Sequence, residues 1–218
     1  MEREGDQVAE SSQREPLKLP LPLDGTLRID RPLRADAART MRKILEVAEE
    51  VLSKDPAATL EKIAAAAGVA RTTVYRRFAT REALIDAMSE VAMREVEQAI
   101  DEGRPETAPP MVAFHQITAN LIEIKSGWRF TMNQAHALHG TAAKIHGRIF
   151  DKCMRLLERA QASGAIRPEV DLIWARSAYH ALIEQAFRER AETGGDPDAL
   201  AERLIDTLFN GIGPGRPS

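Results

Sequence analysis

Basic and hydroxyl-bearing side chains crowd one short stretch of this 218-residue chain. Six of the seven residues from position 71 to position 77 carry a hydrogen-bond donor: Arg71, Thr72, Thr73, Tyr75, Arg76 and Arg77. Guanidinium groups bind phosphates and the major-groove edge of guanine, and hydroxyl groups bind phosphates. A short helix over this stretch would present all of these donors to a duplex, which is the chemistry of a DNA recognition helix.

Two short helices joined by a glycine turn must position these donors. Thr59 is placed to cap the first helix, because its hydroxyl can accept a hydrogen bond from a free backbone N–H. Gly68 follows the alanines at 64–67, where a left-handed residue ends a helix at little cost. Val69 can fill the corner between the helices. Val74 and Phe78 lie four residues apart, so we expect them to point inward and leave the arginines outside.

A third helix follows directly. Thr80 is placed to cap it, and the free amides of its first turn, together with Arg81, form an anion site suited to a phosphate. Before the motif, an apolar stripe predicts an amphipathic helix over residues 38–52, and Lys54-Asp55-Pro56 should end it, because the residue before a proline leaves helical geometry.

The whole ordered series, from about residue 36 to residue 88, resembles the helix-turn-helix of the tetracycline-repressor (TetR) family of bacterial transcription regulators. The resemblance rests on the amphipathic helix, on A-x-x-A-G-V at 64–69, on T-V-Y-R-R-F at 73–78 and on R-E-A-L at 81–84. Ala70 departs from the family, which often has a hydroxyl residue capping the recognition helix there, so about 1 kcal/mol of cap stability is in doubt. The alternative reading is an ordinary helical hairpin with a solvated basic face.

The motif assigns a role to each donor. Three side chains are expected to contact base edges: Arg71, Thr72 and Arg77. Five others are expected to hold phosphates: Thr59, Thr73, Tyr75, Arg76 and Arg81. One recognition helix reads only a few base pairs, so a homodimer is expected to place two of them about 34–36 Å apart on the inverted repeat of a palindromic operator in double-stranded DNA.

The charge distribution agrees with a polyanionic partner near the motif. The net charge of the chain is −3, but from Arg31 to Arg81 there are 11 Lys or Arg against 6 Asp or Glu. The rest of the chain carries 19 basic and 27 acidic residues. Such asymmetry suggests that one part of the chain meets nucleic acid, although an uneven scatter of surface charge would give the same count.

The remaining sequence predicts an all-α protein with about nine helices. Residues 1–33 are read as a largely disordered tail, 34–82 as the three-helix DNA-binding domain and 83–218 as a larger C-terminal helical bundle for ligand binding and dimerisation. One long helix should run from Arg81 towards Ile100. The glycine and proline separators then predict helices at about 109–125, 128–138, 141–163, 169–193 and 197–211.

In the TetR family the C-terminal bundle usually dimerises through its last two long helices and holds an inducer pocket. Apolar stripes on these helices suit an interface or an internal core: Leu172, Ala175, Tyr179, Leu182 and Ala186, then Leu200, Leu204 and Leu208. The expected pocket residues combine apolar surface with polar groups: Met111, Phe114, Trp128, Met132, His136, Tyr179 and Ile183, with Phe130 and Trp174 as further candidates. They predict a small, largely apolar effector, although any one of them could simply fill the core.

Other classes of protein have weaker support. The histidines at 136, 139 and 146 with Cys153 lack the spacing of a metal site, so no metal and no cofactor is expected. No phosphate loop, dinucleotide motif or G-x-S-x-G elbow suggests an enzyme. An all-helical binding module without DNA contact is the nearer alternative.

The expected location is the cytoplasm. The first residues lack the apolar segment of a signal peptide, and no uncharged apolar run approaches the ~20 residues that cross a bilayer. The single cysteine fits a reducing compartment.

Overall fold

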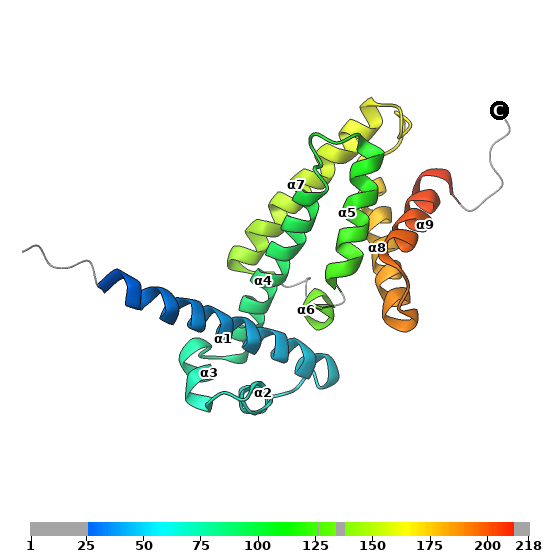
Figure 1. Cartoon of the computed structure of the whole chain (residues 1–218). Coiled ribbons are helices and arrows are strands. Elements are labelled where there is room, and N and C mark those ends of the chain that lie inside the picture. Colours follow the sequence, from blue (N-terminus) through cyan, green and yellow to red (C-terminus); the bar gives the residue numbers. More distant parts are fainter. Residues whose placement is uncertain (1–25, 126, 134–137, 212–218) are drawn as a thin grey trace, which may run out of the picture. The chain divides into compact units, whose positions relative to one another are not determined.

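The structure is a computed structural model that describes residues 26–125, 127–133 and 138–211 (Figure 1). These residues form nine α-helices and no strand, which confirms the predicted all-α fold. The helices are, in chain order, α1 (Thr26–Lys54), α2 (Leu60–Ala67), α3 (Arg71–Arg77), α4 (Arg81–Glu102), α5 (Pro110–Lys125), α6 (Arg129–Asn133), α7 (Gly140–Ala162), α8 (Leu172–Thr193) and α9 (Pro197–Asn210).

The first helix begins earlier than its apolar stripe predicts. The sequence predicts a helix start at residue 38 and a largely disordered tail over residues 1–33, but α1 already begins at Thr26. The prediction of a disordered tail is therefore wrong for residues 26–33, and residues 1–25 lie outside the described part. Leucine, arginine and alanine are strong helix formers, and in residues 26–39 they outweigh the single Pro32.

Contacts divide the chain within α1, into one unit up to Thr40 and another from Met41 onward. In the second unit, an N-terminal core joins the end of α1 to the three helices that follow. It contains Ile44, Leu52, Ile63 and Met88, all with no exposed surface. The predicted stop at Lys54 is confirmed, since α1 ends there and Asp55 N donates to Val51 O at 2.8 Å.

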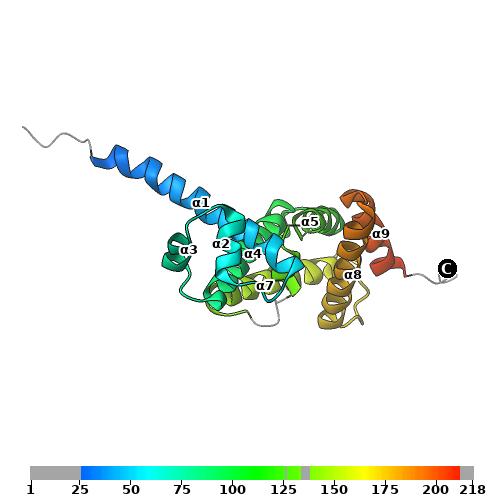
Figure 2. The same cartoon turned by 90° about the horizontal axis from the view of Figure 1, so that it is seen from below.

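Helices α4, α7, α8 and α9 pack around α5. It contacts α4 and α7 on one side and α8 and α9 on the other, and α4 also runs alongside α7 (Figures 1 and 2). Their shared C-terminal core includes Phe114, Ile122 and Leu157. Gly103 permits a close approach, because a Cβ there would lie 2.3 Å from Ile117 Cγ1 on α5.

Apart from the start of α1, the predicted boundaries hold within three residues except for the helix expected at 128–138. The structure gives α6 only five residues, ending at Asn133, with 134–137 outside the described part. No helix in the described ranges is long and apolar enough to span a membrane.

Candidate nucleic-acid interface and ligand-binding core

The turn between α2 and α3 has the predicted geometry. Thr59 caps α2, since its hydroxyl oxygen accepts from Lys62 N at 3.4 Å. Gly68 ends α2 in the left-handed region with φ 66°, where a side chain would be strained. Its N–H and that of Val69 donate to Ala65 O and Ala64 O at 3.2 and 3.1 Å. These bonds satisfy the last carbonyls of α2 and fix the direction in which α3 leaves.

Two buried side chains fix the orientation of α3. Val74 is fully buried and Phe78 is 3% exposed, as predicted, and both belong to the N-terminal core. Ala70 occupies the N-cap position of α3 and makes no side-chain hydrogen bond there, so the departure noted in the sequence is present in the structure. The seven-residue helix is therefore held by packing from beneath, and its polar side faces away from the core.

A carboxylate on α2 binds two of the predicted DNA-contacting residues. Glu61 Oε1 accepts a hydrogen bond from the Tyr75 hydroxyl at 2.5 Å and from Arg71 Nη2 at 2.5 Å. The Arg71 guanidinium also lies over the Tyr75 ring, 5.3 Å from its centroid. We call Glu61, Arg71 and Tyr75 the Glu61 clasp. The hydrogen bond from Tyr75, with smaller contributions that include Arg71, lowers the pKa of Glu61 to about 2. The Glu61 carboxylate is therefore ionised at neutral pH.

The rest of α3 offers donors that are not engaged. Thr72, Arg76 and Arg77 are exposed, and none of them has a hydrogen bond or ion pair with another residue of the described ranges. Thr73 is half-buried. The outer side of α3 therefore carries two guanidinium groups and a hydroxyl that are available to a ligand.

Arg81 lies at the start of α4 and is already bound within the protein. Its Nη2 donates to the carbonyl oxygen of Pro56, while its Nε is buried without a partner. Thr80 caps α4 as predicted, accepting from Ala83 N at 3.1 Å. Arg81 thus ties α4 to the loop before α2, and a phosphate would find it half-buried rather than extended into solvent.

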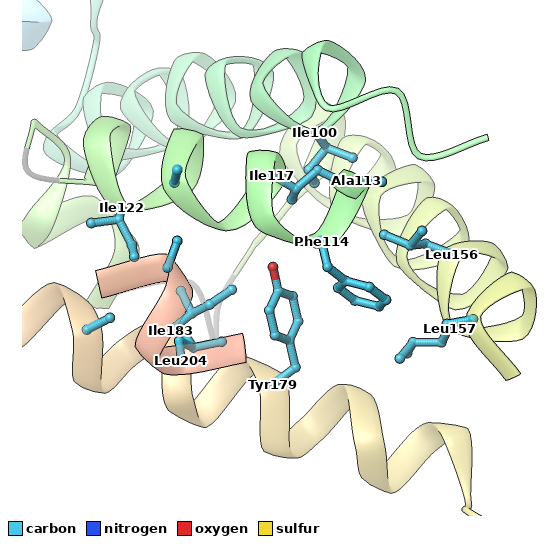
Figure 3. Close-up of a cluster of buried hydrophobic side chains, with 14 of the residues drawn as sticks. Ile100, Ala113, Phe114, Ile117, Ile122, Leu156, Leu157, Tyr179, Ile183 and Leu204 are labelled. Atoms are coloured by element: carbon cyan, nitrogen blue, oxygen red, sulfur yellow. The ribbon is translucent and has the colours of Figure 1, made fainter. Parts of the chain in front are cut away.

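The C-terminal core brings three of the predicted pocket residues together. Figure 3 shows Tyr179 reaching from α8 towards Phe114 on α5, with Ile183 beside it. The rings of Phe114 and Tyr179 meet edge to face with centroids 5.6 Å apart, and Phe209 of α9 meets Phe114 in the same way at 5.4 Å. These contacts join α5, α8 and α9 through aromatic side chains.

One buried polar pair lies inside this apolar cluster. The Thr118 hydroxyl donates to Phe114 O at 2.6 Å, so the Tyr179 hydroxyl donates to Thr118 Oγ1, at 2.7 Å. Burial raises the pKa of Tyr179, which keeps the phenol neutral. A ligand entering here would meet aromatic walls with two hydroxyl groups able to orient it.

The space beside this pair is small in the present conformation. A cavity of about 10 Å³ has Phe114, Tyr179, Cys153 and Leu157 among its lining residues. This is room for about one water. Burial raises the pKa of the Cys153 thiol, which therefore stays protonated.

The remaining predicted pocket residues do not join this group. Trp128 and Met132 pack into the N-terminal core instead, and the Trp128 indole N–H donates to Glu95 Oε2 at 2.6 Å. Phe130 belongs to the same core. Met111 and Trp174 are exposed at 36% and 72%. His136 lies outside the described residues.

A buried carboxylate joins α1 to α6. Glu49 on α1 is 4% exposed and accepts from Phe130 N, from Thr131 N at 3.1 Å and from the Thr131 hydroxyl at 2.6 Å. Ser53 adds a fourth donor at 3.2 Å. The carboxylate thus binds the free amides at the start of α6.

The stripes on the last two helices serve mainly as intramolecular core. Tyr179, Ala186, Leu200 and Leu204 are buried within the chain, which corresponds to the alternative reading of those stripes. A shallow apolar groove lies on the adjoining face of α8 and α9 and includes two residues of the stripes, Leu182 and Leu208. Its other lining residues are Trp174, Ser177, Ala178, Ala181 and Thr207.

Sequence reasoning missed Glu61, Glu49 and Thr118. Glu61 could have been noticed as an acid ten residues before Arg71, in the first turn of the preceding helix, whereas nothing local marks the partners of Glu49 and Thr118. No cluster of three potential metal ligands occurs within the described residues.

The helices around the Glu61 clasp resemble those of known proteins. A family model described as bacterial regulatory proteins of the tetR family matches residues 44–88, which include all of α2, α3 and the Glu61 clasp. The HTH-type transcriptional repressor LfrR of Mycolicibacterium smegmatis is 29% identical over 175 residues, which cover 80% of this chain and 90% of LfrR.

Solved structures extend the similarity to the C-terminal helices. LfrR from Mycobacterium smegmatis in complex with proflavine gives a TM-score of 0.65 at 25% identity, covering 81% of this chain and 98% of that one. PfmR from Thermus thermophilus gives 0.68 at 21% identity, over 78% and 99% of the two chains. FadR from Bacillus subtilis in complex with stearoyl-CoA gives 0.63 at 20% identity, over 79% and 99%. The last two similarities concern the fold alone.

Proposed function

Because the chain belongs to the tetR family of bacterial regulatory proteins, we propose that it is a cytoplasmic repressor that binds a palindromic operator as a homodimer. A small, largely apolar effector releases it. Residues 34–82 bind DNA in this account, and residues 83–218 bind the effector and the second subunit.

The exposed side of α3 carries the proposal. Arg76, Arg77 and Thr72 project from a helix whose inner side is fixed by Val74 and Phe78, so the helix presents their donors outward. Guanidinium groups suit the phosphates and guanine edges of a duplex. A protein partner could also bind these donors through its carboxylates. Recovery of an inverted repeat among bound duplexes would distinguish DNA binding from binding to such a partner.

The groove on α8 and α9 supports a homodimer. Trp174 is 72% exposed and Leu182 and Leu208 line the groove beside it, which is a large apolar surface to leave in water. A second copy of the chain, related by a two-fold axis, would cover this groove with the same face of its own. Two recognition helices related by that axis would read two half-sites in opposite orientation.

The C-terminal core supports binding of an apolar effector. LfrR has been solved with proflavine, and the more distant FadR with stearoyl-CoA. In this chain the Phe114–Tyr179 contact and the Thr118 hydroxyl offer an apolar site with two polar groups. The present cavity is too small for such a ligand, so the effector must bind a conformation in which α5, α7 and α8 have moved apart.

Release then follows from a difference in affinity. The effector binds the opened conformation more tightly than the closed one. This difference in affinity sets how far it shifts the population towards the opened conformation. The Glu49 contacts carry the change to the DNA-binding helices, because they join α1 to the start of α6. A change in the spacing of the two recognition helices lowers the affinity for the operator.

Selection of bound sites from a pool of random duplexes tests the proposal. The purified protein should recover an inverted repeat whose half-site centres lie about 10–10.5 base pairs apart or a multiple of that spacing. Binding should weaken steeply as salt rises. Failure to retain any duplex at low salt would reject a DNA-binding function, and recovery of single half-sites alone would reject the homodimer.

A further inference from the structure

The Glu61 clasp occupies donors that DNA binding would need. Tyr75 and Arg71 are predicted to contact phosphate and base, yet both are bound to the same carboxylate oxygen at 2.5 Å. Thr59, a third predicted contact, also helps to lower the pKa of Glu61. The carboxylate thus lies among side chains assigned to the duplex.

The chemistry of the Tyr75 hydroxyl makes these two uses exclusive. A phenol has a single proton to donate. While Tyr75 donates its hydroxyl hydrogen to Glu61, it cannot donate to a phosphate oxygen. If the hydroxyl turns to a phosphate, the ionised Glu61 carboxylate loses this donor and remains close to a polyanion. Arg71 retains other N–H groups, but the guanidinium is held over the Tyr75 ring and close to Glu61.

We propose that Glu61 sets the affinity of the protein for duplex DNA, because its carboxylate competes with the duplex for Tyr75 and Arg71. The inference rests on the proposed DNA-binding function. Phosphate contacts form on every duplex, so the free-energy cost of opening the clasp lowers the affinity for unrelated DNA and for the operator alike. Base-edge hydrogen bonds add to the affinity for the operator but do not remove that cost.

Glu82 provides a matched control for Glu61. Each glutamate is the second residue of a helix and follows a threonine cap, Thr59 for Glu61 and Thr80 for Glu82. Both are near the recognition helix in sequence, but Glu82 makes no contact with α3 that the structure records. Glu61→Gln and Glu82→Gln therefore remove the same charge from equivalent positions, and only the first opens the clasp.

The experiment measures binding of both variants and the unsubstituted protein to an unrelated duplex and to the selected operator, over a range of salt. Glu61→Gln should bind the unrelated duplex about two- to fivefold more tightly, the range expected for releasing an exposed ion pair. Its salt dependence should steepen by about 0.9 for each phosphate gained. The affinity for the operator should rise by a similar factor, whereas Glu82→Gln should raise neither affinity by as much.

A second pair of variants tests the route through Tyr75. In a Tyr75→Phe background no hydroxyl group binds Glu61, so the increase in affinity caused by Glu61→Gln should be smaller. A gain of the same size in both backgrounds, equal effects of Glu61→Gln and Glu82→Gln, or weaker binding by Glu61→Gln would each overturn the inference. These results leave the regulator account intact, whereas an unsubstituted protein that binds no duplex removes both.

Discussion

Arg76 and Arg77 carry the same charge at neighbouring positions of α3, but helical geometry turns them about 100° apart. They therefore cannot make the same contact with a duplex. Both are exposed, so replacing either should leave the fold intact and report on DNA alone. This makes the pair a direct comparison between a phosphate contact and a base contact.

We expect Arg76→Ala to weaken binding to all duplexes alike and to reduce the salt dependence by about one phosphate contact. Arg77→Ala should instead relax discrimination at one or two positions of the half-site by about 1–3 kcal/mol each. Affinities for a panel of single-base variants of the selected site would separate the two. Uniform weakening by Arg77→Ala, with the preferred sequence retained, would contradict the base-reading role.

At the scale of helices, ion pairs join α4 to α7. Glu97 on α4 accepts from Arg148 Nε at 2.8 Å and Nη2 at 2.6 Å and from Lys152 Nζ at 3.2 Å. The hydrogen bonds from Arg148, followed by those from Lys152, lower the pKa of Glu97 to about 2. The folded protein therefore keeps this carboxylate ionised at a pH where an unfolded chain protonates it.

The stabilisation by Glu97 should be fully present above the pKa of an unfolded glutamate, about 4.3, and be lost as pH falls towards 2. Arg148 is about half exposed, so water screens the pair and the contribution should be about 1 kcal/mol. Urea unfolding of the protein and of Glu97→Gln should differ by that amount at pH 6–8, and the difference should shrink as the pH falls from about 4 towards 2. A difference that persists unchanged to pH 2 would refute the assignment.

The link between α1 and α6 should matter more for stability. Glu49→Ala leaves two amides and a hydroxyl of the α6 start buried without their acceptor, so we expect the free energy of unfolding to fall by about 2–3 kcal/mol. Glu50 is the matched control, because it is adjacent and exposed. Glu50→Ala should change the same quantity by less than about 0.5 kcal/mol. Equal effects of the two substitutions in urea unfolding would show that the Glu49 contacts are not stabilising.

The DNA-binding helices were predictable because their signals are local. Thr59, Gly68 and Thr80 mark helix ends by their own chemistry, and the four-residue spacing of Val74 and Phe78 indicates the inward side. The structure confirms each of these. Such features depend on neighbours within one or two helical turns, which a sequence displays directly.

The candidate pocket was less predictable, because its members meet across long sequence separations. Trp128 looks like a pocket residue by type, but Glu95, 33 positions earlier, binds its indole N–H and holds it in the N-terminal core. Tyr179 finds Thr118 at a separation of 61. Residue type and helical spacing say which side chains are apolar, but not which helix each of them will face.

For the whole molecule, the apolar groove on α8 and α9 predicts self-association. Trp174→Glu places a charge in that groove, and because Trp174 is 72% exposed the monomer should fold normally. Sedimentation should show a shift from dimer to monomer, accompanied by loss of operator affinity. Ala162→Glu, at an exposed position on α7, should remain dimeric. A Trp174→Glu protein that stays dimeric would place the interface elsewhere.

The central claim is that the exposed side of α3 enters the major groove. Interference by methylated bases tests it directly, because guanine N7 lies on the major-groove edge and adenine N3 on the minor-groove edge. On the selected operator, methylation at guanine N7 within the half-sites should block binding, and Arg77→Ala should become insensitive to it at one position. Binding that tolerates every N7 methyl group but is blocked by N3 methylation would contradict the account.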